Sequence, residues 1–281
     1  MRVSNPLCNS CFLFHDIAIK VWRDIIYAHM VYIDESEVGL TKKIIVELKH
    51  FHKKCNTIGL DVYAKSGYKE EIYGSDIDLF VEISPNQYVW YALQSKVLKL
   101  NKTYTTLRDG YSPRNRNYQW EKLTLLEGLT GCKSYYLLYN GVEDFDYRGL
   151  DFCSISFNES QFGCSLVEPK IIENYALKTD ARGHFISPTF DDLHPNHAQP
   201  WRVLVCCPKQ KSTLTKYKLE TILESNKDLG FVKTNSSNDE SESNGKDSNM
   251  NQKSFNKITE GISESKWKPD YRIIYSNKNL Q

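Results

Sequence analysis

The first fifty residues have the spacing of two amphipathic helices. Between residues 14 and 31 the apolar residues share one helical face: Phe14, Ala18, Val21, Trp22, Ile25 and Ala28. A second helix is predicted from about Glu37 to His52, because its apolar residues form a helical stripe with lysines opposite. The chain therefore begins with two helices that each have one face to bury.

Alternating polar and apolar residues then predict strands. Such runs cover residues 59–63, 75–83 and 88–98, and the turn residues Ser84-Pro85-Asn86-Gln87 separate the last two. We therefore expect the last two strands to be neighbours in one antiparallel hairpin.

The next segments complete an α/β pattern. The polar, basic stretch 108–117 contains glycine and proline and is predicted to be a loop. Residues 118–129 form a predicted helix that ends at Thr130-Gly131, and 134–139 form a predicted buried strand. Helix, helix, three strands, helix and strand in this order predict a mixed sheet flanked by helices.

The rest of the chain is less regular. We expect a strand at 151–157, a helix at 168–177 and a last strand at 201–207. Residues 234–254 consist almost wholly of Ser, Asn, Asp, Glu, Lys and Gly, a composition that cannot bury a core and predicts disorder. Beyond them, the segment Tyr271 to Tyr275 is expected either to dock back or to bind a partner.

These features divide the chain into three parts. With 281 residues there is room for one sizeable domain, which we place at residues 1–230. A disordered low-complexity linker follows at 231–258, and a C-terminal tail at 259–281.

Composition restricts the class of protein. The chain is 40% hydrophobic and 25% charged, as is ordinary for a globular protein. Its 36 basic and 35 acidic residues give a net charge of +1, so any contact with nucleic acid must be local. It has neither an apolar run of about eighteen residues nor a signal-peptide pattern, which predicts a cytoplasmic protein with no membrane contact.

The eight cysteines do not form a metal or disulfide framework. They are scattered, mostly within apolar sequence, and are expected to be reduced core residues. Cys8 and Cys11 alone have the spacing of zinc ligands, and no second pair lies nearby, so a helix entry is the preferred interpretation.

The candidate chemistry lies on the predicted hairpin. Period two places Asp76 and Asp78 on one face of the first strand, and Gln94 and Lys96 on one face of the second. Two carboxylates, an amide oxygen and a lysine are thus expected to converge. Carboxylate and amide oxygens suit a hard divalent cation such as Mg²⁺, and an ammonium beside the ion can position water or stabilise charge on a phosphate.

This pattern resembles the PD-(D/E)XK, or restriction-endonuclease-like, nuclease superfamily. Within it, the chain is similar to an uncharacterised bacterial domain family in which glutamine replaces the acidic residue of the E-x-K element. The resemblance spans roughly residues 5–220. It rests on Glu37-Val38-Gly39-Leu40-Thr41, Glu70 to Asp78, Leu93-Gln94-Ser95-Lys96, Tyr118-Gln119 through Leu137-Leu138-Tyr139-Asn140, Phe162-Gly163-Cys164-Ser165 and Pro200-Trp201.

The resemblance implies a restriction-endonuclease-like mixed sheet and a metal-dependent endonuclease acting on double-stranded DNA, with Mg²⁺ or Mn²⁺ as cofactor. It assigns catalysis to four residues: Asp76, Gln94, Lys96 and Glu37. It assigns the metal to Asp76, Gln94 and Glu37, and we add Glu70 as a further ligand. Such nucleases often belong to restriction or phage-defence systems, as homodimers or with partner subunits.

Four further residues are considered for substrate contact. Arg114 and Arg116 lie in the basic loop and can contact phosphates, while Arg108 in the same stretch has the same chemistry. Gln119 opens the following helix and is placed near the pocket. Each of these positions is also compatible with an ordinary surface role.

Two alternatives stay open. Gln94 lacks the charge of the usual ligand, so Glu70, Glu71 or Asp78 would have to compensate, or the domain is an inactive nuclease-like binding subunit. Alternatively, Ser75 to Val81 is similar to the metal-binding strand of polymerase-β-like nucleotidyltransferases. That family's Gly-Ser phosphate-binding turn is missing upstream, where Ser66-Gly67 has the reverse order.

Overall fold

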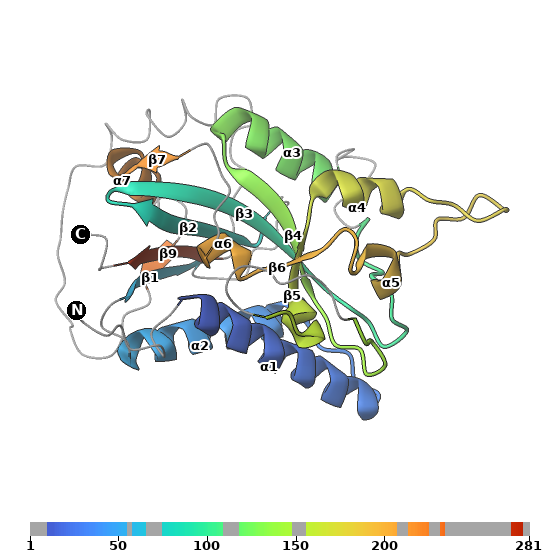
Figure 1. The fold of residues 1–281 in the computed structure, drawn as a ribbon. Coiled ribbons are helices and arrows are strands. Elements are labelled where there is room, and N and C mark those ends of the chain that lie inside the picture. Colours follow the sequence, from blue (N-terminus) through green and yellow to red (C-terminus); the bar gives the residue numbers. More distant parts are fainter. Residues whose placement is uncertain are drawn as a thin grey trace.

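The computed structural model describes residues 10–54, 58–65, 75–108, 118–147, 156–206, 213–224, 231–233 and 271–277 (Figure 1). These residues form one mixed sheet with helices on both faces, which confirms the predicted α/β architecture. The stretch 234–254, predicted to be disordered, lies outside them. Within the described segments, no helix combines the length and apolar character needed to span a bilayer.

Helices cover both faces of the sheet. On one face lie α1 (Ser10–Met30) and α2 (Glu37–Lys54); on the other lie α3 (Gln119–Thr130), α4 (Pro169–Ala176) and α7 (Lys216–Glu224) (Figure 1). Shorter elements are η2 (Glu159–Gly163), α5 (Phe190–Leu193) and α6 (Val203–Cys206). The four predicted helices are present, whereas α7 was not predicted.

The strands are β1 (Ile58–Lys65), β2 (Ile77–Ser84), β3 (Gln87–Val97), β4 (Lys133–Tyr139), β5 (Cys164–Val167), β6 (Gln199–Pro200), β7 (Leu214–Thr215), β8 (Phe231–Lys233) and β9 (Tyr271–Asn277). Their order is β6-β5-β4-β3-β2-β9-β1-β8, and β7 pairs with β3. The predicted hairpin is confirmed, since β2 and β3 are antiparallel with Ile77 opposite Leu93. β4 is parallel to β3.

The alternation along β3 separates two cores. Val89, Tyr91 and Leu93 pack on the α1 and α2 side, whereas Trp90 and Ala92 pack on the α3 and α7 side. Because both faces are covered, ten of the eleven residues of this strand are buried. The central strand is therefore rigidly held, which is what a functional site beside it requires.

The predicted strand at 201–207 is wrong. β6 ends at Pro200, and the chain then turns into α6, where the amides of Leu204 and Cys206 donate to the carbonyls of Trp201 and Arg202. The Trp201 indole is held by α1, since its Nε1 donates to the carbonyl of Phe14 at 2.7 Å. The apolar run was buried by packing on a helix and not by pairing in a sheet.

Two other expectations concern irregular segments. Residues 151–155 of the predicted strand at 151–157 lie outside the described residues, and Ser156 and Phe157 have no regular structure. No disulfide joins the described cysteines, Cys11, Cys132, Cys164 and Cys206. Cys8, the partner that Cys11 would need for zinc, lies outside the described residues.

The C-terminal segment docks back onto the sheet, which confirms one of the two expectations. β9 lies between β1 and β2, parallel to β2 and antiparallel to β1. β8, at the start of the predicted linker, also pairs with β1. Residues 234–270 lie outside the described residues. The strands on either side of them belong to the same sheet as residues 58–65.

Candidate functional site

The candidate site lies where β2 and β3 separate. The first paired residue of β2 is Ile77, opposite Leu93, so residues 94–97 of β3 extend beyond it. On the other side, these four residues remain paired with β4. Polar side chains at this end of β3 therefore lie at an opening between two strands, yet on a rigid support.

Asp76 closes the end of the β2–β3 ladder. Its backbone amide donates to the carbonyl of Leu93 at 2.8 Å. Its carboxylate oxygen Oδ2 then accepts from the Ser95 amide at 2.8 Å, and also from the Ser95 hydroxyl. The side chain thus takes the place of a backbone carbonyl as the acceptor of the Ser95 amide. Hydrogen bonds to a charged carboxylate are stronger than those between neutral groups.

Gln94 contacts the same carboxylate. Its Nε2 donates to Oδ2 of Asp76 at 2.8 Å, while its Oε1 is buried and has no hydrogen-bond partner. The residue is 2% exposed. Leaving a buried acceptor unpaired costs about 1–3 kcal/mol, so a cation or a water bound to this oxygen would recover that free energy.

Lys96 and Glu37 form the second half of the site. Lys96 Nζ lies 3.6 Å from Oε2 of Glu37, and the two side chains are 4% and 25% exposed. The other carboxylate oxygen of Glu37 accepts from the Thr106 hydroxyl at 3.1 Å. An ammonium this deeply buried needs a carboxylate nearby, so the ion pair fixes both groups.

The electrostatics of Glu37 connect the two halves. Burial raises the pKa of Glu37 above its ordinary value, Lys96 lowers it, and the negative charge of Asp76 raises it again. The Thr106 hydrogen bond and Lys99 have smaller lowering effects. The charge of Asp76 therefore acts on Glu37, which links the two carboxylates electrostatically.

The first turn of α2 is held against β4, which positions Glu37. The Thr41 hydroxyl donates to the carbonyl of Glu37 at 2.8 Å and lies 2.9 Å from the hydroxyl of Tyr139. Tyr139 is completely buried, and burial raises its pKa well above the ordinary value, so it stays neutral. A neutral anchor leaves the charge of the site unchanged.

Asp78 does not join this site, contrary to the expectation that it converges with Asp76. It is fully buried, and its Oδ2 lies 3.3 Å from Nε of Arg272 on β9. Burial raises the pKa of Asp78 to about 7, against the opposing effect of Arg272. The period-two rule failed here because Asp76 lies in the bend before β2, where strand geometry has not yet begun.

The remaining candidates are not brought to the site by any described contact. Glu70, Glu71, Arg114 and Arg116 lie outside the described residues. Gln119 begins α3 and has a buried Oε1 without a hydrogen-bond partner.

Arg108 has a structural environment. Its Nη1 donates to the carbonyl of Ala176 at 3.1 Å, and its guanidinium lies over the ring of Phe185 at 4.8 Å. It therefore holds the segment after α4, and its guanidinium is already engaged. The sequence predicted that Arg108 is either solvated in a loop or in contact with a phosphate. Its described contacts are instead with Ala176 and Phe185.

Sequence reasoning missed two residues of the site. Ser95 holds Asp76 through its amide and hydroxyl, and Thr106 holds Glu37. A serine that interrupts an apolar strand between Gln94 and Lys96 was a usable signal. Thr106 had none, because it lies 69 residues from its partner in a loop without periodicity.

The donor set fits a hard cation. In the described part of the chain, no group of three or more His, Cys, Asp or Glu side chains is arranged to hold a metal ion. Here only Asp76 and Glu37 are carboxylates, and the third oxygen is the unpaired amide oxygen of Gln94. Three oxygens of this kind suit Mg²⁺ or Mn²⁺, which usually keep several water ligands.

Comparison with known proteins identifies a family without a known activity. A family model described as "Family of unknown function (DUF6615)" matches residues 10–278. No curated protein and no solved structure matches the chain.

Proposed function

The chain belongs to the DUF6615 family, and we propose that it is a metal-dependent nuclease that hydrolyses phosphodiester bonds in DNA. One observation carries this proposal. At the separation of β2 and β3, Asp76, Gln94 and Lys96 meet Glu37 from α2, and the buried oxygen of Gln94 has no partner.

The surroundings of the site support the resemblance to the PD-(D/E)XK nucleases. Asp76 directly precedes β2, the Gln94-Ser95-Lys96 element lies on the neighbouring antiparallel strand of a mixed sheet, and Glu37 comes from the preceding helix. These are the three sources of site residues that the resemblance implies.

Each residue has a role that follows from its contacts. Asp76, Glu37 and the Gln94 Oε1 would hold the cation. A bound Mg²⁺ or Mn²⁺ supplies an activated water and neutralises charge on the scissile phosphate. Lys96 keeps its ammonium beside Glu37 at 4% exposure, where a fixed charge acts strongly on a substrate, and would orient water or stabilise the developing charge.

A catalytically inactive, nuclease-like binding subunit is the second candidate. The observation favouring it is that Gln94, a neutral ligand, already donates its amide to Asp76. The nucleotidyltransferase alternative receives no such support, because its second carboxylate, Asp78, is fully buried beside Arg272. Double-stranded DNA as substrate, and a restriction or phage-defence role with partner subunits, belong to the nuclease proposal.

The test compares wild type, Lys96→Met and Lys218→Met on supercoiled plasmid, in EDTA, Mg²⁺ or Mn²⁺. Lys218 is an exposed lysine of α7 and serves as the control. We expect metal-dependent nicking that Lys96→Met reduces by about 10²-fold or more and Lys218→Met leaves intact.

Undiminished cutting by Lys96→Met would refute the proposed site. DNA binding without cutting by the wild type would favour the inactive subunit. Transfer of label from nucleoside triphosphates to an acceptor would instead favour a nucleotidyltransferase.

A further inference from the structure

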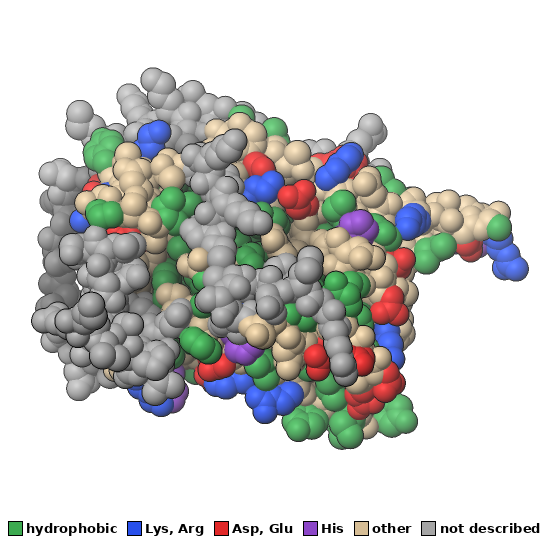
Figure 2. Space-filling model, viewed as in Figure 1, with side chains coloured by type: hydrophobic (Ala, Val, Ile, Leu, Met, Phe, Trp, Pro, Cys, Tyr) green, Lys and Arg blue, Asp and Glu red, His purple; other side chains and the backbone are tan. Residues whose placement is uncertain are grey.

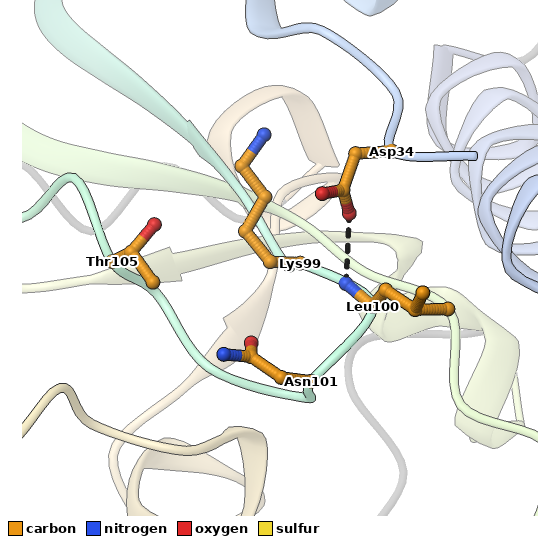
Figure 3. Close-up of a pocket in the computed structure, with 5 residues that line it drawn as sticks. All are labelled: Asp34, Lys99, Leu100, Asn101 and Thr105. Carbon is orange, nitrogen blue, oxygen red and sulfur yellow. Dashed lines mark hydrogen bonds between the residues drawn. The ribbon is translucent and has the colours of Figure 1, made fainter. Parts of the chain in front are cut away.

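An open surface cavity with both polar and apolar lining lies near the candidate site. It has a volume of about 400 Å³ and is lined by Asp34, Lys99, Leu100, Asn101 and Thr105 (Figure 3). Ligand pockets usually begin at about 300 Å³, so this one has room for a nucleotide. None of the four proposed catalytic residues lines it.

The cavity is linked to the site through residues next to its lining. Lys99 follows the end of β3, its Nζ donates to the carbonyl of Glu35 at 3.5 Å, and its charge lowers the pKa of Glu37. Thr105 lines the cavity, while the next residue, Thr106, donates to Glu37. A ligand in the cavity would therefore lie on the side of the site where Glu37 pairs with Lys96.

The cavity is built on a held loop. The Leu100 amide donates to Oδ1 of Asp34 at 2.8 Å, which ties the loop to the segment between α1 and α2 (Figure 3). Within the loop, the Lys99 amide donates to the carbonyl of Thr103 at 3.0 Å, and the Tyr104 ring beneath is 1% exposed. The lining groups are thus positioned before any ligand arrives.

The lining chemistry matches one nucleotide. Lys99 offers a cation for one phosphate. Asn101, whose oxygen already accepts from Thr103, offers its amide nitrogen as a donor, and Thr105 offers a hydroxyl for a sugar or base. Asp34 is an acceptor and disfavours a second phosphate. Acidic and basic side chains are mixed over the described part of the face shown in Figure 2.

We propose that this cavity binds the nucleotide that flanks the scissile phosphate of the DNA strand, with Lys99 contacting its phosphate. The inference rests on the proposed function and extends it, because it names a substrate subsite separate from the catalytic residues. It makes Lys99 a substrate-binding residue.

The experiment measures binding of two unrelated fluorescent duplexes by anisotropy in EDTA, from about 50 to 200 mM salt. We expect Lys99→Met to weaken both about tenfold and to reduce the slope of log K against log salt by about 1, and Lys99→Arg to retain wild-type values. The salt slope counts phosphate contacts, so a structural effect alone would not change it.

Lys218→Met is the matched control. It lies on α7, which follows the strand paired with Gln87 at the start of β3, whereas Lys99 lies just past the end of this eleven-residue strand. The two lysines are therefore separated by about the length of β3, roughly 35 Å. We expect wild-type affinity and slope.

The outcomes separate this inference from the proposed function. Wild-type affinity and slope in Lys99→Met would refute the subsite, even if the protein cuts DNA. Altered binding by Lys99→Met in a protein that never cuts would keep the subsite and refute hydrolysis. No binding of DNA by the wild type in EDTA would refute the subsite, while the metal-dependent nicking assay tests hydrolysis separately.

Discussion

At the residue scale, Asp76 holds β3 as well as facing the proposed cation. Its carboxylate satisfies the amide and hydroxyl of Ser95, which is 2% exposed. Removing it leaves a buried amide without its acceptor, so we expect Asp76→Ala to lower the free energy of unfolding by about 1–3 kcal/mol. Asp76→Asn keeps an acceptor oxygen and should cost less.

Urea unfolding of the two variants and the wild type measures this difference. Equal losses in both variants would contradict the structural role of the carboxylate oxygen. If the role is correct, loss of cleavage in Asp76→Ala alone is not evidence for metal binding, and Asp76→Asn is the variant to use for that purpose.

Gln94 controls the affinity for the cation in the proposed site. In Gln94→Glu, the new carboxylate loses the hydrogen bond to Asp76 and repels it. We expect a lower thermal midpoint in EDTA, and a Mg²⁺ concentration for half-maximal cleavage that falls about tenfold because a charged ligand replaces a neutral one.

The control is Gln87→Glu at the other end of β3. It adds the same charge far from the site and should leave the metal dependence unchanged. A Gln94→Glu protein with unaltered Mg²⁺ dependence would show that this side chain is not a ligand.

Thr106 sets the pH dependence through Glu37. A ligand carboxylate must be ionised, so cleavage should rise with pH through the pKa of Glu37, which burial already raises. The Thr106 hydrogen bond lowers this pKa, so Thr106→Val should raise it further and move the acid limb of kcat/KM to higher pH.

Measuring kcat/KM from about pH 5 to 9 tests this shift. Thr124→Val, which removes a hydroxyl bonded to a carbonyl within α3, is the control. Coincident acid limbs for wild type and Thr106→Val would exclude Glu37 as the group that titrates.

At the element scale, the packing of α1 on η2 depends on a glycine. A Cβ at Gly163 would lie 1.9 Å from the carbonyl oxygen of Ala18 and 2.8 Å from the amide of Trp22. Both are backbone atoms of α1, so they cannot move aside cheaply. We expect Gly163→Ala to lower the free energy of unfolding by about 1–3 kcal/mol.

Gly128→Ala is the opposite case and serves as the control. Gly128 lies on the exposed side of α3, and a Cβ there meets nothing within 4 Å. Alanine is the better helix former, so this change should stabilise by about 0.5–1 kcal/mol. Denaturant titration of both variants is the measurement, and two changes of the same sign would contradict the close approach of α1 and η2.

At the scale of the whole molecule, β9 joins the C-terminal segment to the centre of the sheet. Arg272 is fully buried, with Nε 3.3 Å from Asp78 and Nη1 donating to the carbonyl of Ile222. The amide of Tyr271 donates to the carbonyl of Asp76 at 3.0 Å, so β9 also supports the candidate site.

The pH dependence of Arg272→Met follows from Asp78. Its folded pKa of about 7 exceeds the ordinary 3.8, so the contribution of Asp78 to stability is greatest below about pH 4 and is lost as the pH rises to 7. Without Arg272, which lowers this pKa, the loss should continue above pH 7 and reach about 3–5 kcal/mol relative to wild type.

Urea unfolding at acidic and alkaline pH measures the difference between wild type and Arg272→Met, which should grow with pH. Lys233→Met is the control, because it breaks an ion pair of the same sheet, 2.7 Å from Asp61, in which both side chains are about half exposed. That change should cost no more than about 1 kcal/mol. A pH-independent loss in Arg272→Met would mean that Asp78 does not titrate as described.

The sequence by itself determined the elements whose signals are local. The β2–β3 hairpin was predicted correctly because its alternation and its turn at 84–87 lie within about twenty residues. This also placed Asp76 beside the strand that carries Gln94 and Lys96. The helix carrying Glu37 was predicted from periodicity, and the helix carrying Gln119 from its end at Thr130-Gly131.

The tertiary structure decided which distant segments meet. Residues 203–206 form a helix against α1, and β9 is inserted between β1 and β2. Asp78 forms an ion pair with Arg272 and does not lie with Asp76 in the candidate site. The tertiary structure also brought Thr106 to Glu37, 69 residues away. Periodicity reports which face of an element is buried, whereas the partner that buries it is chosen by packing between segments far apart in the chain.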